Sequence, residues 1–322
     1  MSAQLLHIPD LTPRKPFLEA AGDPYIRMMQ ALRAVEGDPA RLPEPLSLRY
    51  QHNLAANLMK EKVFFSVVKR LNDHGITDIA PLKGILWLQT LYRDISGVRT
   101  MCDVDILLRK KDYSPSRRIL APIARVHGSQ SRRPILNALF HEYSAVIGDT
   151  LVEIHRGQHP MDLFSVDYDD LFLHAVPCEE RGLRYRKISP EHALIFSLIH
   201  DLSAGFAYPF VSWRHLAEMR LLLAHVSLTA VRDLAVRYDM EELLDLYLFL
   251  LYTLFEEPGL TTDQFRIRPW FAGIIKGRDP QPFRFDKGDR LFKLILFRRT
   301  LSRFLLPRII ALPDHLVKPF LK

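Results

Sequence analysis

The stretch Asp103-Val-Asp-Ile-Leu-Leu108 decides the fold, because it joins two carboxylates to an apolar strand. Side chains at positions i and i+2 of a strand point to the same face, so Asp103 and Asp105 would lie side by side while Val104 faces the core. The three apolar residues that follow would anchor the pair in a sheet. Hard carboxylate oxygens suit Mg²⁺ or Mn²⁺, so this strand is a candidate metal site.

A second stretch has the same spacing and needs a different interpretation. Two aspartates separated by one residue are expected roughly once by chance in a chain of this length. Asp167-Tyr-Asp169 lies in a polar stretch before a helical segment, where helix capping or solvation explains the carboxylates. Only the pair at Asp103 and Asp105 is followed by a run that predicts a buried strand.

Cationic groups precede this strand at two places. A short apolar run from Ile76 ends in Lys83-Gly84 and leads into a helix over 85–92, which predicts a strand, a tight turn and a helix. Pro81 cannot donate to a sheet, so the strand is an edge strand or locally irregular. Lys83, with the free amides beside Gly84, could bind phosphate, although such turns also occur in ordinary folds. Arg99 could contact a triphosphate, or be a surface arginine.

A hairpin over 143–155 supplies the third acidic group. Gly148-Asp149 is a strong turn signal between two alternating segments. Glu153 and His155 would share one face of the second strand, opposite Val152 and Ile154. Glu153 could complete a metal site or act as a general base. The alternative is a solvent-facing polar stripe.

The rest of the chain is predicted to be helical at both ends. We expect a short helix over 25–35, a proline-rich linker, and a long amphipathic helix that ends at Gly75. After Ser189, which is typical of an N-cap, helices are expected over 190–202, 212–225, 228–237, 241–255 and 288–305. The predicted domains are an N-terminal segment (1–45), a catalytic core (46–187) and a helical domain (188–322).

Composition excludes several classes of protein. With 322 residues, 48% of them hydrophobic, the chain can bury a core, and its two cysteines indicate neither a disulfide scaffold nor a zinc site. No signal peptide or membrane span is visible, so we expect a cytoplasmic protein without stable membrane insertion. The net charge of +7 arises from residues 266–322, where 14 Lys/Arg face 4 Asp/Glu. That segment could meet RNA, anionic lipid or, most simply, the protein's own acidic remainder.

Taken in order, these motifs resemble the bacterial uncharacterised nucleotidyltransferase family over roughly residues 45–225. The motifs that carry the likeness are Pro81-Leu-Lys-Gly-Ile85, Tyr92, Gly97-Val-Arg99, Asp103-Val-Asp-Ile-Leu-Leu108, Val152-Glu-Ile-His155, Ser189-Pro-Glu-His192, His200-Asp201 and Trp213 to Glu218. The resemblance implies an α+β, polymerase-beta-like nucleotidyltransferase core, a mixed small sheet with flanking helices, followed by a helical region. Two features depart from the superfamily: Lys83-Gly84 replaces its usual Gly-Ser turn, and Glu153 stands where Asp is usual.

The expected activity is metal-dependent transfer of a nucleotidyl group from a nucleoside triphosphate to an acceptor hydroxyl on a protein, a tRNA or a small molecule. In this interpretation Asp103, Asp105 and Glu153 are the catalytic and metal-binding carboxylates. The nucleotide is expected to contact Lys83, Gly84, Arg99 and His155. The alternative is a catalytically weak nucleotide-binding or interaction protein on the same fold, associated with membrane surfaces through its basic C-terminal helix.

Overall fold

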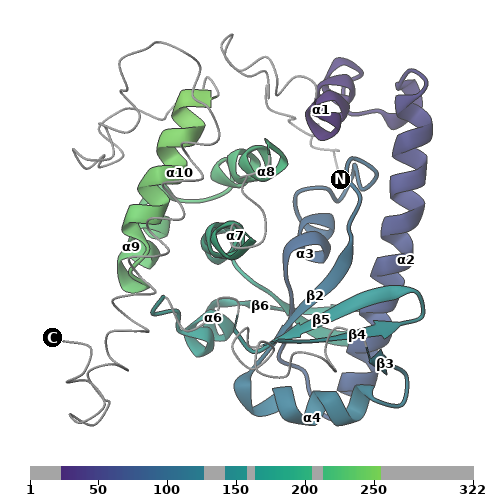
Figure 1. Cartoon of the computed structure of the whole chain (residues 1–322), viewed down its shortest axis with the longest axis vertical. Helices are drawn as coiled ribbons and strands as arrows, with labels where there is room; N and C mark the ends of the chain where they lie inside the picture. Colours follow the sequence, from purple (N-terminus) through teal and green to yellow (C-terminus); the bar gives the residue numbers. More distant parts are fainter. Residues whose placement is uncertain (1–22, 127–141, 158–163, 205–212, 255–322) are drawn as a thin grey trace, which may run out of the picture.

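Five strands form one mixed sheet in the order β1-β2-β5-β4-β3 (Figure 1). The computed structural model describes residues 23–126, 142–157, 164–204 and 213–254. The strands are β1 (Ile79–Pro81), β2 (Asp103–Leu108), β3 (Arg125–Val126), β4 (Glu142–Ile147) and β5 (Thr150–His155). Only β2 and β5 pair in parallel; every other pairing in this sheet is antiparallel. The predicted α+β class is therefore confirmed.

The two central strands are β2 and β5, and the residue pattern explains their place. Val104, Ile106, Val152 and Ile154 are fully buried, as the alternation in both segments predicts. β1 lies at the edge of the sheet, where the missing N–H of Pro81 costs no ladder hydrogen bond. The turn at Gly148 and the strands on either side of it also form as predicted.

Helices of the first half flank this sheet. They are α1 (Pro24–Ala34), the short 3-10 helix η2 (Pro39–Arg41), α2 (Leu46–Asn72), α3 (Lys83–Gln89) and α4 (Lys110–Leu120). The long helix α2 runs along one side of the molecule in Figure 1 and contacts β2, β7, α3 and α4. Its predicted apolar face is only partly buried, since Leu58 is 53% exposed and the first turns bury Tyr50, Asn53 and Asn57 instead.

The sequence predicts a helix from Asp112 to about Val126, capped by Asp112 and kinked at Pro122, but the observed helix is shorter. It begins at Lys110, so Asp112 lies in its first turn rather than at its cap, and it ends at Leu120. Pro122 follows the helix instead of kinking it, and the chain then enters β3. Pro122 has no backbone N–H to continue the helical hydrogen bonding, whereas Pro115 lies inside α4 and does not end it.

One hairpin was not predicted, while the helical segment expected after Asp167 forms as a short helix. β6 (Val176–Glu180) and β7 (Leu183–Lys187) pair through a tight turn, in which Arg181 and Gly182 both have positive φ. The hairpin contacts β1 and α2 through β7. α6 (Tyr168–His174) is capped by Asp167. The Asp167 carboxylate accepts hydrogen bonds from the backbone N–H groups of Asp169 and Asp170. The capping role expected for Asp167 is thus confirmed.

A helical region follows the sheet and lies on the side of the molecule opposite α2 (Figure 1). It contains α7 (Pro190–Ala204), α8 (Trp213–Leu223), α9 (Leu228–Arg237) and α10 (Glu241–Leu254), which pack on one another, while α1 packs on α8. Ser189 caps α7 as predicted, through its hydroxyl and the backbone N–H of His192. The predicted helix over 288–305 and the basic segment lie outside the described residues.

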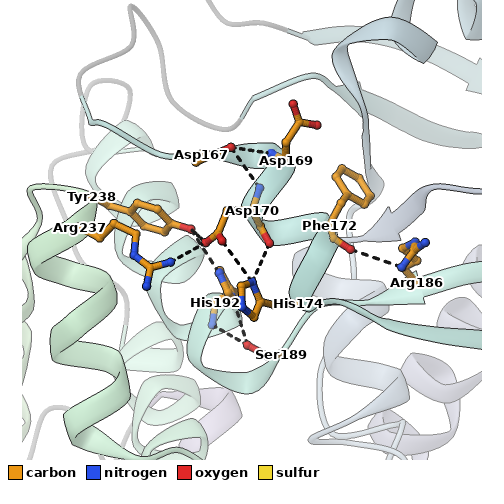
Figure 2. A network of polar contacts seen from close by, with 10 residues as sticks. All are labelled: Asp167, Asp169, Asp170, Phe172, His174, Arg186, Ser189, His192, Arg237 and Tyr238. Atoms are coloured by element: carbon orange, nitrogen blue, oxygen red, sulfur yellow. Dashed lines mark hydrogen bonds and ion pairs between the residues drawn. The ribbon is translucent and has the colours of Figure 1, made fainter.

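A polar network joins α6 to α9 and to the start of α7 (Figure 2). The carboxylate of Asp170 accepts hydrogen bonds from Arg237 at 2.8 Å and from the hydroxyl of Tyr238 at 3.2 Å. Behind them His192 is buried, with one ring nitrogen 3.3 Å from the Tyr238 hydroxyl and the other 2.9 Å from the hydroxyl of Ser189. Burial lowers the pKa of His192, although the nearby Asp170 charge opposes this effect.

This lowered pKa makes folding stability depend on pH. The unfolded chain binds a proton at His192 near pH 6.5, while the folded protein resists it, so stability is lost as the pH falls below about 6.5. For one proton the slope is at most about 1.4 kcal/mol per pH unit. We expect urea unfolding between pH 7.5 and 5 to show a shallower pH dependence in His192→Gln than in the wild type. Identical slopes in the two proteins would contradict this assignment.

Candidate active site

Asp105 is the centre of the site. It lies in the middle of β2, with only 1% of its surface exposed. Its Oδ1 accepts a hydrogen bond from the Lys83 ammonium at 2.7 Å and lies 2.9 Å from Nε2 of His155. Its Oδ2 is also buried but has no hydrogen-bond partner among the described residues. A buried carboxylate oxygen without a partner is rare, and it marks a position where a ligand could bind.

Strand register explains which groups join Asp105. In the parallel pair of β2 and β5, Asp105 lies opposite Glu153, and His155 projects from the same face two residues further on. Ligand atoms of Asp105, Glu153 and His155 all lie within 4.8 Å of one another, an arrangement that could hold a metal ion. The expected shared face of Glu153 and His155 is therefore present, and it faces the protein rather than solvent, since His155 is 3% exposed.

Opposite charges stabilise the ionised forms of the central groups. Burial alone would raise the pKa of the Asp105 carboxyl, but the Lys83 charge and the bond to His155 hold it well below its usual range. Burial alone would likewise lower the pKa of the Lys83 ammonium, but the carboxylates of Asp105 and Glu153 raise it. The site thus contains a carboxylate and an ammonium that are both charged at neutral pH.

Asp103 has a different environment from Asp105. It starts β2 opposite Leu151, so it has no acidic neighbour directly across the strand pair, and it is outside the group of three. Burial raises the pKa of Asp103, and the nearby Asp105 charge raises it further. Two carboxylates on one strand face repel each other unless a cation lies between them.

The turn between β1 and α3 brings Lys83 to this face. Lys83 has a φ of +45°, which is uncommon for a residue with a side chain and is found where surrounding structure enforces it. The backbone N–H of Leu82 donates to the carbonyl of Asp105 at 3.0 Å, which fixes the turn against β2. At Gly84 a Cβ atom would lie 2.8 Å from the side chain of Met101, so a larger residue there would require that side chain to move.

Arg99, expected on the triphosphate, has an internal partner. Its guanidinium forms an ion pair with Glu218 of α8; Glu218 is buried, and the side chain of Arg99 is only 10% exposed. The Tyr92 hydroxyl donates to the same carboxylate oxygen at 3.1 Å, and the Tyr25 hydroxyl lies 2.7 Å from that of Tyr92. Burial alone would lower the pKa of Arg99, but the Glu218 carboxylate raises it. Glu218 was not singled out from the sequence as a site residue, because its partner is 119 positions away.

A pocket of about 140 Å³ lies beside these groups. Lys83, Gly84, Arg99 and Asp103 line it from the core. The opposite wall comes from α7 and α8 and consists of Ala193, Phe196, Ser197, His200, Arg214, His215 and Glu218. The rings of His200 and His215 meet edge to face, with their centroids 5.4 Å apart. The pocket therefore opens next to Asp103, at the boundary between the sheet and the helical region.

The amino-acid sequence matches a known protein family. The sequence profile of the uncharacterised nucleotidyltransferase family matches residues 28–256, which is most of the chain and includes both site strands. The chain belongs to this family. The protein is thus an enzyme of the nucleotidyltransferase type, and the resemblance seen in its motifs is confirmed. No curated protein matches the sequence.

Solved structures similar to this nucleotidyltransferase include two of the antibiotic-resistance factor ANT(2″)-Ia. Its solution structure has 13% sequence identity and a TM-score of 0.37, covering 56% of this chain and 91% of that one. Its crystal structure in complex with adenylyl-2″-tobramycin has 14% identity and a TM-score of 0.37, covering 54% and 94%. Among the residues that the structure describes, no helix combines the length and the apolar character that crossing a membrane requires.

The residues present fit a divalent cation. The buried Oδ2 of Asp105 has no hydrogen-bond partner within the described ranges, and Glu153 adds a second hard oxygen from the adjacent strand. His155 contributes an imidazole nitrogen, which Mn²⁺ accepts more readily than Mg²⁺ does. Asp103 stands next to this group on β2. The predicted carboxylates are therefore brought to one face, with His155 joining Asp105 and Glu153 more closely than Asp103 does.

Proposed function

We propose that this nucleotidyltransferase transfers a nucleoside monophosphate from a nucleoside triphosphate to an acceptor hydroxyl, with Mg²⁺ or Mn²⁺ held by Asp105, Glu153 and His155 beside Asp103. The observation that carries the proposal is the buried Oδ2 of Asp105, which has no hydrogen-bond partner in the described part of the chain although ligand atoms of Glu153 and His155 are within 4.8 Å of the Asp105 carboxylate. When bound, the metal supplies positive charge to the phosphate oxygens that become more negative during transfer.

The chain's own residues supply the remaining chemistry. The ammonium of Lys83, fixed at the turn beside Gly84, neutralises triphosphate oxygens. Asp103 lines the pocket and would accept the proton of the acceptor hydroxyl, while Glu153 would serve the metal. The hydroxyl oxygen bonds to the α-phosphorus, the bond from that phosphorus to the bridging oxygen breaks, and pyrophosphate leaves. The pocket wall from α7 and α8 would contact the acceptor, which is a protein, a tRNA or a small molecule.

Thermal unfolding tests the binding step without any acceptor. The unfolding temperature is measured with each nucleoside triphosphate, with and without Mg²⁺ or Mn²⁺, for the wild type and for Asp105→Asn. At a ligand concentration of about 100 times the dissociation constant, binding adds about 2.7 kcal/mol of stability, which is a shift of several degrees. The shift should require the metal and should disappear in the variant. A wild type that no triphosphate stabilises would remove the main support for catalysis.

One observation favours a second function, a nucleotide-binding protein with weak catalysis. The Lys83 ammonium forms an ion pair with Asp105, so the central carboxylate already has a positively charged partner without metal. On this alternative, a triphosphate would bind through Lys83 with little dependence on metal. The thermal experiment separates the two functions. Stabilisation by the triphosphate that is equal with metal and with a chelator supports nucleotide binding with weak catalysis. Membrane-surface association through the basic C-terminal segment rests on residues outside those described.

A further inference from the structure

The loop that leads into β2 is held by a buried asparagine of α2. Asn57 has no exposed surface. Its side-chain amide donates hydrogen bonds to the carbonyls of Ser96 and Arg99, both at 2.6 Å, and its carbonyl accepts from the backbone N–H of Met101 at 3.0 Å. One side chain thus satisfies three backbone groups of a loop that makes no strand or helix of its own.

A second asparagine, one turn earlier on the same helix face, extends this arrangement. Asn53 is 5% exposed, and its amide donates to the carbonyl of Gly97 at 3.1 Å. The side-chain carbonyl accepts from the hydroxyl of Thr100 at 2.6 Å. Gly97 lies so close to α2 that a Cβ atom there would collide with the main-chain oxygen of Tyr50. We call Asn53 and Asn57 the asparagine clamp.

The clamp occupies positions where a packing helix ordinarily has apolar residues. Residues four apart lie on one face of a helix, and on α2 this face is turned towards the loop rather than towards solvent. An apolar side chain at either position would leave buried backbone groups without partners, which is costly. The polar choice is therefore explained by the loop that the helix holds.

The loop holds three parts of the site in place. Asp103 begins β2 two residues after Met101, where the loop ends. Arg99 reaches from it to Glu218 in the pocket wall. The side chain of Met101 packs against Gly84, in the turn that presents Lys83, and a Cβ atom at Gly84 would displace it. A shift of this loop would move all three of these elements together.

We propose that Asn53 and Asn57 are positioning residues for nucleotidyl transfer, because they fix loop 96–101 and thereby hold Asp103 and the Lys83-Gly84 turn in the geometry that binds metal and triphosphate. The inference rests on the proposed function. Sites whose supporting residues are fixed in advance bind and react faster, and loss of such support commonly reduces metal affinity or activity by about 10- to 100-fold.

The chain offers a matched control on the same helix. Asn72 also makes three hydrogen bonds to backbone groups: its amide donates to the carbonyls of Ile76 and Arg184, and its carbonyl accepts from the N–H of Arg184. Those partners lie near the hairpin of β6 and β7, away from loop 96–101. Asn57→Ala and Asn72→Ala therefore each remove three side-chain-to-backbone hydrogen bonds from α2, but only the first releases the loop.

The experiment measures three quantities on full-length wild type, Asn57→Ala and Asn72→Ala. They are the urea midpoint without ligand, the affinity for a nucleoside triphosphate with Mn²⁺, and the hydrogen exchange of backbone amides in residues 96–103. Asn57→Ala should bind about 10- to 100-fold more weakly and exchange faster in the loop. Asn72→Ala should lower the urea midpoint while keeping wild-type affinity and loop protection. Should Asn57→Ala fail to fold, Asn53→Ala removes only two of the clamp's five bonds and should shift both readouts in the same direction.

Two results would overturn the inference: a folded Asn57→Ala that binds like the wild type, or an Asn72→Ala that loses as much affinity as Asn57→Ala. A wild type that binds no triphosphate is a failure of the proposed function instead. Hydrogen exchange then still decides whether the clamp fixes the loop. Faster exchange confined to residues 96–103 in Asn57→Ala supports it, and unchanged protection of the Met101 amide refutes it.

Discussion

Asp105→Asn is expected to abolish nucleotidyl transfer, with a loss of about a thousandfold or more. The amide cannot supply the negative charge that a divalent cation needs, and it leaves the Lys83 ammonium without its anionic partner at 2.7 Å. The variant keeps the size of the side chain, so the packing of β2 should survive. Transfer of label from an α-³²P nucleoside triphosphate to protein, tRNA and small-molecule fractions measures the loss, while circular dichroism checks the fold.

Two further asparagine variants make this result specific. Asp103→Asn should also lose transfer, because Asp103 lines the pocket and adjoins the group formed by Asp105, Glu153 and His155. Asp167→Asn should transfer like the wild type, since Asp167 caps α6 and asparagine is an equally good cap. An active Asp105→Asn protein, or an Asp167→Asn protein as inactive as the other two, would refute the assignment of the site.

Local sequence patterns predicted the elements that carry this site, because their signals are short-range. Alternation of apolar residues identifies β2 and β5, and Gly148 marks the turn between β4 and β5. The hairpin of β6 and β7 was missed although Gly182 lies in its turn. Its second strand, Leu183-Arg-Tyr-Arg-Lys187, is mostly charged, and only Tyr185 is buried. That strand is stabilised by its contacts with β1 and α2, which no local pattern reveals.

The site likewise has features that local sequence patterns predict and features that they do not. Strand periodicity is enough to place Glu153 and His155 on one face, but the parallel register that puts Glu153 opposite Asp105 depends on how distant segments pair. The sequence also does not reveal how burial differs between the two aspartates: Asp103 is half-buried, and Asp105 is almost wholly buried. The clamp residues Asn53 and Asn57 had a readable signal, polar residues one turn apart on a helix, but only the loop reveals their purpose.

Glu218→Gln is expected to be the most destabilising of these substitutions, by about 3–5 kcal/mol, because it leaves the buried charge of Arg99 unpaired. Glu218 is 3% exposed, and the same oxygen accepts from Arg99 and from the Tyr92 hydroxyl. The control is Asp73→Asn, which breaks the exposed Lys69–Asp73 pair and should cost at most about 1 kcal/mol. Urea unfolding of both variants measures the difference, and equal costs would contradict the buried ion pair.

A double variant then separates the two roles open to Arg99. Replacing both members of a buried ion pair by apolar residues removes the unpaired charge, so Arg99→Met with Glu218→Leu should recover much of the stability that Glu218→Gln loses. If Arg99 also contacts the triphosphate from its place in the pocket wall, the stable double variant should still bind the metal-bound nucleotide more weakly than the wild type. Full affinity in that protein would mean that Arg99 only joins the loop before β2 to α8, and that phosphate is bound by the other cationic side chains of the pocket, Lys83 and Arg214.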